Sequence, residues 1–200
     1  MKINLVGECF EMTDNTRIAE LPQVPEAKGF DEVVCAALDH PLDLQPLAQW
    51  DLRGKRVAIM VDDWGRPTPC GDFLPSVLDR LNAAGAMHDP MDDDRMIAKV
   101  GLEAFRRVRC ISHDGGNESM LAFCGVTPMG TPVWVNRYVA EADFKMAFGR
   151  IYPHSTYGYE GGYKMIVPGV ASFETIVRDH SLNYSSFSDY GIVRDNPSRG

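Results

Sequence analysis

The sequence lacks the features that mark several large classes of protein. Its 200 residues include only five cysteines, odd in number and never spaced as C-x-x-C, which argues against a disulfide framework and a thiolate zinc site. No lysine or arginine cluster offsets a net charge of −8, so nucleic acid and anionic membranes are disfavoured partners. No apolar run is long enough for a membrane span or a signal peptide. We therefore expect a protein of the reducing cytoplasm, of unspecified oligomeric state.

Internal repeats and low-complexity tracts are also missing, while 44% of the residues are hydrophobic, enough to bury one core. Short β-branched runs alternate with segments of helical periodicity. This alternation is typical of an α/β fold, with a largely parallel sheet and flanking helices. We expect residues 1–200 to form one domain.

The predicted elements follow from these patterns. Strands are expected at 56–61, 108–111, 132–136 and 144–149, and helices at 74–81, 91–101, 138–142 and 173–180. The three consecutive acids that open the second helix are most simply capping residues rather than metal ligands. The strand at 56–61 should be fully buried, and it leads into the polar loop DDWGRPTPC. Open α/β sheets bind ligands at the carboxyl ends of such strands.

The segment from 151 to 180 carries most of the residues capable of chemistry. Gly158, Gly161 and Gly162 allow the backbone to approach a bulky or anionic group closely, and Lys164 follows two residues later. The spacing fits neither a P-loop nor the G-x-G-x-x-G of a dinucleotide fold. Folding alone does not require so many glycine, histidine and lysine residues in one connection.

The last helix should begin after Ser172 as its N-cap. Phe173, Val177 and His180 recur at helical spacing with Ile176, so we expect His180 to face inward with this apolar stripe. Taken singly, His180 reads as a satisfied core residue, His154 as a loop-capping residue and Lys164 as a surface charge.

Taken together, the motifs resemble a known family. His154, Lys164 and His180, set around GYEGGYK and PGVASFET, resemble the signature of the lactate racemases that use a nickel-pincer nucleotide. The loop DDWGRPTP is similar to that family's Asp-x-x-Arg-Pro-Thr-Pro, and GTPVWVNRYVAEADFKMAFGRI is similar to its approach to the first histidine. The resemblance covers essentially the whole chain and implies the N-terminal, cofactor-binding domain of a normally two-domain enzyme.

The resemblance also implies a reaction, namely racemisation or epimerisation at the hydroxyl-bearing carbon of a small 2-hydroxy acid by hydride transfer. Lys164 would bind the cofactor covalently, and His180 would be the protein ligand to nickel. His154 would be a general base toward the substrate hydroxyl, and Arg66 would bind the substrate carboxylate. The residues implied to contact the cofactor are Lys164, Asp63, Gly161 and Gly162.

Three departures from the family pattern accompany the resemblance. The strand and Gly-x-His loop that normally precede the acidic helix are missing, and His88 is either the second catalytic base or a helix-end residue. Gly65 replaces a threonine, and the family's C-terminal domain is absent from this chain.

Two alternatives to the racemase function therefore remain. One is a catalytically inactive cofactor-binding or interaction domain, and the other is a phosphate-binding α/β protein without nickel.

Overall fold

The computed structural model describes residues 2–5, 8–11, 28–63, 66–85, 94–182 and 185–198. The helices are α1 (Phe30–Asp39), α2 (Cys70–Ala83), α3 (Asp94–Val100), α4 (Leu102–Arg107), α5 (Arg137–Ala140) and α6 (Phe173–Ser181). The strands are β1 (Lys2–Leu5), β2 (Glu8–Glu11), β3 (Val57–Val61), β4 (Leu121–Val126), β5 (Pro132–Asn136), β6 (Phe144–Phe148), β7 (Pro153–His154) and β8 (Gly158–Tyr159). Short 3₁₀ turns occupy Leu47–Gln49, Glu118–Met120 and Gly162–Met165.

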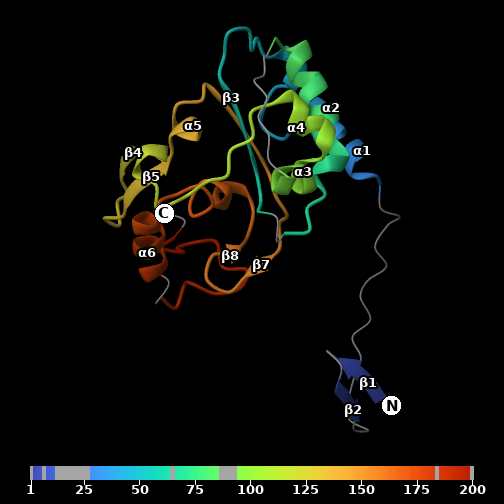
Figure 1. The fold of residues 1–200 in the computed structure, drawn as a ribbon. Coiled ribbons are helices and arrows are strands. Elements are labelled where there is room, and N and C mark those ends of the chain that lie inside the picture. Colours follow the sequence, from blue (N-terminus) through green and yellow to red (C-terminus); the bar gives the residue numbers. More distant parts are fainter. Residues whose placement is uncertain are drawn as a thin grey trace.

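The α/β class predicted from the sequence is confirmed, with a parallel sheet flanked by helices. Its two strands, β3 and β6, run in register from Val57 opposite Phe144 to Val61 opposite Phe148. The other strand pairs that the structure describes, β1–β2, β4–β5 and β7–β8, are antiparallel. In Figure 1, α1 to α4 lie along one side of β3, and α6 with the β4–β5 hairpin lies along the other.

The main core lies between the parallel strands and α2. That helix buries one apolar face, made of Cys70, Phe73, Leu74, Val77, Leu78 and Leu81, against α4 and the inner face of β3 and β6. The spacing of these residues is that of an amphipathic helix, as the sequence predicted. Burial on β3 is weaker than expected, because Met60 is its only fully buried residue. Within the described residues, no helix is both long enough and apolar enough to cross a membrane.

Two sequence predictions about local structure are wrong. Residues 108–111 form no strand, although Val108 has an extended backbone, with φ −137° and ψ 155°. A β-branched residue favours extended backbone, but a strand also needs a neighbouring strand to which it can hydrogen-bond.

The second wrong prediction concerns the buried face of α6. Phe173 is 62% exposed and Val177 is 65% exposed, so the apolar stripe and His180 face outward.

The orientation of α6 has a specific cause. Ser172 caps the helix as predicted, accepting a hydrogen bond from the Thr175 amide. The Thr175 hydroxyl then donates to the Pro132 carbonyl over 2.9 Å and accepts from the Trp134 amide of β5 over 3.0 Å. Thr175 and Asp179, one helical turn apart, are consequently the buried residues of α6. Polar contacts with a strand, rather than apolar periodicity, set the buried face.

Candidate active site

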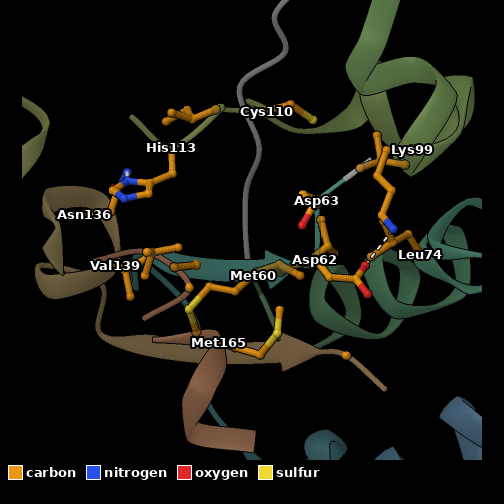
Figure 2. Close-up of a pocket in the computed structure, with 18 of the residues that line it drawn as sticks. Met60, Asp62, Asp63, Leu74, Lys99, Cys110, His113, Asn136, Val139 and Met165 are labelled. Carbon is orange, nitrogen blue, oxygen red and sulfur yellow. Dashed lines mark hydrogen bonds and ion pairs between the residues drawn. The ribbon is translucent and has the colours of Figure 1, made fainter. Parts of the chain in front are cut away.

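The loop after β3 is held by a buried ion pair. Lys99 of α3 places its Nζ 2.6 Å from Asp62 Oδ1, and the two side chains are only 9% and 13% exposed. The same ammonium donates to the carbonyls of Arg66 and Thr68 over 3.0 and 3.1 Å, and the Thr68 hydroxyl donates to Asp62 Oδ2 over 2.5 Å. Figure 2 shows Lys99 reaching down to Asp62, with Asp63 beside them. This network fixes the backbone that carries Arg66.

The Arg66 side chain reaches across to the segment that follows β6. Its Nη1 donates to Glu160 Oε2 over 2.6 Å and also contacts the Tyr152 hydroxyl. Its Nε lies 3.7 Å from Asp63 Oδ2. The hydrogen bond to Glu160 raises the pKa of Arg66 further above its usual range, so the guanidinium is a permanent cation here.

Glu160 is the central anion of the site. Besides Arg66, its carboxylate faces His154 Nε2 at 3.4 Å and Lys164 Nζ at 3.6 Å. Burial alone would raise the pKa of Glu160, but hydrogen bonds from Tyr152 and Arg66, with the charge of Lys164, lower it overall. Glu160 is therefore ionised, and it links groups from both loops.

The His154 ring is oriented by the turn between β7 and β8. Its Nδ1 accepts hydrogen bonds from the backbone amides of Thr156 and Tyr157, over 3.1 and 3.3 Å, so the neutral ring carries its proton on Nε2, toward Glu160. Burial, then the positive charge of Lys164, lowers the pKa of His154 below 6.5, and Glu160 only partly opposes this. The imidazole is neutral at pH 7, as an exchanger of protons near neutrality requires.

Lys164 and His180 meet at one aromatic ring. Lys164 Nζ lies 4.0 Å from the ring centroid of Tyr157, and the His180 ring packs edge-on against the same tyrosine at 5.6 Å. The His154 ring contacts it too, at 5.2 Å. The structure thus brings together the histidines and the lysine that the sequence singled out, even though His180 leaves the core.

Gly161 and Gly162, which precede Lys164, have different structural roles. A Cβ on Gly161, which has φ +81°, would lie 2.6 Å from the Arg150 carbonyl oxygen, so close packing and backbone conformation both demand glycine there. Gly162 has φ +58° and meets nothing within 4 Å. Only Gly162 leaves open space in which a ligand can approach the backbone.

A cavity of about 1330 Å³ adjoins this cluster. At the carboxyl ends of β3 and β6 its wall includes Asp63, Arg66, Glu160, Gly161 and Lys164, whereas His154 and His180 lie outside the wall. Figure 2 shows Met60 and Met165 on its floor and His113 beside Asn136 at the opposite end from Lys99. Lys164 and Glu160 therefore connect the cavity with the ring cluster around Tyr157.

Sequence reasoning left out two residues at the centre of the site, Tyr157 and Glu160. Glu160 stands four residues before Lys164, but that spacing predicts an ion pair only on an α-helix, and this segment is a loop that leads into a 3₁₀ turn. Tyr157 is one of four tyrosines between 152 and 163, and nothing in the sequence marks it as the buried one. The predicted second base, His88, lies outside the described residues.

The geometry predicts a measurable effect of Glu160 on His154. Replacing Glu160 with Gln removes a negative charge that opposes the lowering of the His154 pKa, so that pKa should fall further. An NMR titration of the histidine ring resonances would measure it. Glu174→Gln, an exposed acid in the first turn of α6, is the matched control and should leave the titration unchanged. A His154 pKa that rises in Glu160→Gln would contradict this electrostatic assignment.

The chain was compared with known proteins. Residues 9–190 match the family model described as the lactate racemase N-terminal domain. A lactate racemase of Thermoanaerobacterium thermosaccharolyticum is 28% identical over 180 residues, covering 84% of this chain and 42% of that protein. A lactate racemase of Lactiplantibacillus plantarum is 30% identical over 162 residues, covering 75% and 38%. The chain thus spans less than half the length of these relatives.

Solved structures agree with the sequence comparisons. The lactate racemase apoprotein from T. thermosaccharolyticum superposes with a TM-score of 0.75 at 28% identity, covering 84% of this chain and 44% of that chain. A protein from Thermotoga maritima superposes with a TM-score of 0.59 at 26% identity, covering 72% and 41%. From the family match and these likenesses, the chain belongs to the lactate racemase N-terminal domain family.

Proposed function

We propose that this chain is the cofactor-binding domain of a cytoplasmic racemase or epimerase acting at the hydroxyl-bearing carbon of a small 2-hydroxy acid. The proposed reaction transfers a hydride to a nickel-pincer nucleotide bound covalently to Lys164. The observation that carries the proposal is the convergence of Lys164, His154 and His180 on Tyr157, with Arg66 joined to them through Glu160. The match of residues 9–190 to the lactate racemase N-terminal domain also supports it.

The residues present fit such a cofactor. No three His, Cys, Asp or Glu side chains in the described ranges gather closely enough to hold a metal by themselves, so His180 suits a metal whose other ligands come from the cofactor. Lys164 supplies the amine, Gly162 leaves room at the backbone, and Asp63 lines the adjoining cavity. When bound, the cofactor would supply the acceptor that takes the Cα hydride and returns it to either face.

The chain's own residues would handle the charges and protons. Arg66 binds the substrate carboxylate through its guanidinium fork. His154 exchanges a proton with the substrate hydroxyl at Nε2. The Nε2–H tautomer of the structure can only donate at Nε2, so for the ring to act as a base there the tautomer must change, at the cost of the hydrogen bonds that Nδ1 accepts from the Thr156 and Tyr157 amides. The Glu160 carboxylate holds Arg66, Lys164 and the His154 imidazole close to one another.

The test is to produce the chain alongside enzymes that synthesise the cofactor. We expect a mass adduct on Lys164, bound nickel and interconversion of the lactate enantiomers. Running the reaction in D2O adds a test of mechanism, because hydride transfer keeps the original hydrogen on Cα whereas proton abstraction exchanges it. Racemisation with deuterium incorporated at Cα would overturn the hydride mechanism. An adduct without turnover would favour the second candidate, a cofactor-binding or interaction domain.

The proposed carboxylate clamp predicts the effect of a conservative substitution. Arg66→Lys keeps the charge but loses the planar fork, so the KM for the 2-hydroxy acid should rise about 10–100-fold, the equivalent of one charged hydrogen bond. Steady-state kinetics of the loaded protein would measure it. Arg106→Lys, on the exposed side of α4, is the control. Wild-type KM in Arg66→Lys would rule out the clamp.

A further inference from the structure

Tyr157 occupies an unusual position for a residue outside the main core. It is 1% exposed, and its ring is bordered by His154, His180 and the Lys164 ammonium. A tyrosine buried this deeply needs a partner for its hydroxyl, since an unpaired buried hydroxyl is costly. The identity of that partner determines what the tyrosine can do for its neighbours.

The partner is a buried carboxylate on α6. The Tyr157 hydroxyl donates to Asp179 Oδ2, and Asp179 is 6% exposed. The tyrosine proton is thus directed to Asp179, and Tyr157 Oη, 3.3 Å from His180 Nδ1, is oriented to accept a hydrogen bond from that ring. Asp179 immediately precedes His180, the proposed nickel ligand.

The His180 ring presents Nδ1 to acceptors. Its Nδ1 lies 2.8 Å from the Ile176 carbonyl oxygen, one turn earlier in α6, and 3.3 Å from Tyr157 Oη. A carbonyl oxygen cannot donate, and the Tyr157 proton is engaged by Asp179. The proton of neutral His180 therefore resides on Nδ1, and the Nε2 lone pair is available on a side chain that is 47% exposed.

We propose that Tyr157 and Asp179 are positioning residues for His180, holding it as the Nδ1–H tautomer with Nε2 directed to the metal. The His180 Nδ1–H is shared between the Ile176 carbonyl, at 2.8 Å, and Tyr157 Oη, at 3.3 Å, and the Tyr157 hydroxyl in turn donates to the Asp179 carboxylate. Partners of this kind orient a ligating histidine and make it more basic. The inference rests on the proposed function for the identity of the metal, whereas the orientation and tautomer of His180 belong to the protein alone.

The same arrangement couples the metal ligand to the cofactor anchor. Lys164 Nζ lies over the face of Tyr157, whereas both histidines meet the tyrosine edge-on. A cation over an aromatic face is attracted by the ring quadrupole. Because Tyr157→Phe keeps the ring and removes only the hydroxyl, it separates the role of Oη from the role of the aromatic platform.

The first experiment uses the chain without cofactor. Nitrogen-15 NMR of the histidine rings distinguishes the two neutral tautomers, and we expect His180 as Nδ1–H. Finding the Nε2–H tautomer in the wild-type protein would overturn the proposal whatever any variant does. This readout needs neither nickel nor turnover. Because the Ile176 carbonyl also favours Nδ1–H, the same spectrum of Tyr157→Phe decides the positioning role: we expect its Nδ1–H population to fall, and an unchanged population would assign the tautomer to the Ile176 carbonyl alone and overturn the proposal.

The second experiment uses the cofactor-loaded protein and measures loss of Ni²⁺ to a competing chelator. In Tyr157→Phe we expect nickel affinity to fall about 10–100-fold, the usual cost of removing such a partner, while the Lys164 adduct mass persists. Asp179→Asn, which keeps an oxygen acceptor for Tyr157, should give a smaller loss. Tyr190→Phe, at a 64% exposed tyrosine, is the matched control. Unchanged nickel affinity in Tyr157→Phe would overturn the proposal, whereas absence of adduct and nickel in the wild type would instead refute the proposed function.

Discussion

Replacing Lys164 with Ala should abolish the covalent cofactor adduct and, with it, all racemase activity. The reason is chemical, because the adduct requires a primary amine at this place in the site. Intact-mass measurement of protein made with the cofactor-synthesising enzymes would show the unmodified mass. An unchanged adduct mass in Lys164→Ala would refute the assignment of the anchor.

A loss of adduct could also follow from a damaged site, so a second variant is needed. Lys164→Arg keeps a cation that can lie over the Tyr157 ring and face Glu160, but a guanidinium is not the amine that the bond requires. We expect it to fold normally and to carry no adduct. Lys55→Ala, at an exposed lysine just before β3, controls for loss of a positive charge and should be fully modified.

These expectations share one electrostatic arrangement. The ionised Glu160 carboxylate lies between Arg66 and Lys164, and it faces a histidine whose pKa is lowered by burial and by Lys164. Joining the Lys164 amine to the proposed cofactor as a thioamide would remove one of these charges. The remaining pair, Arg66 with Glu160, would keep its hydrogen bond, so the proposed carboxylate clamp would stay in place after the cofactor is attached.

Much of the fold was predictable because its signals are local. The spacing of apolar residues predicted α2, and Ser172 predicted the start of α6. Strand runs predicted β3, β5 and β6, since parallel or half-buried strands are marked by β-branched residues. Each of these signals lies within about one element, and tertiary contacts reinforce it.

The errors arose where distant contacts overrule local pattern. The apolar stripe of α6 pointed inward on sequence grounds, but Thr175 bonds to β5 and Asp179 to Tyr157, turning the stripe outward. The site residues converge because the loops after β3 and β6 leave the carboxyl ends of paired strands, which is where open α/β sheets bind ligands. The burial of Tyr157 at 1%, against 88% exposure for Tyr163, depends on packing that no sequence period encodes.

The buried ion pair at the first loop predicts the largest effect on stability. Lys99→Met leaves the Asp62 carboxylate buried without its counter-charge and removes the donor to the carbonyls of Arg66 and Thr68. Breaking one side of a buried pair costs about 3–5 kcal/mol. For a chain of this size, such a loss should lower Tm by roughly 6–20 °C. Chemical denaturation would give the free energy of unfolding directly.

The control variant and the test of the ion pair both use residues that flank β3. Lys55→Met removes an exposed lysine and should change the free energy of unfolding by less than about 0.5 kcal/mol. Adding Asp62→Asn to Lys99→Met removes the uncompensated charge while leaving an amide that can still accept from the Thr68 hydroxyl, so the double variant should regain much of the lost stability. If Lys99→Met were as stable as Lys55→Met, the pair would not hold the loop. If the double variant were less stable than Lys99→Met, the lost stability would come from the unpaired carbonyls of Arg66 and Thr68 rather than from the unpaired Asp62 carboxylate.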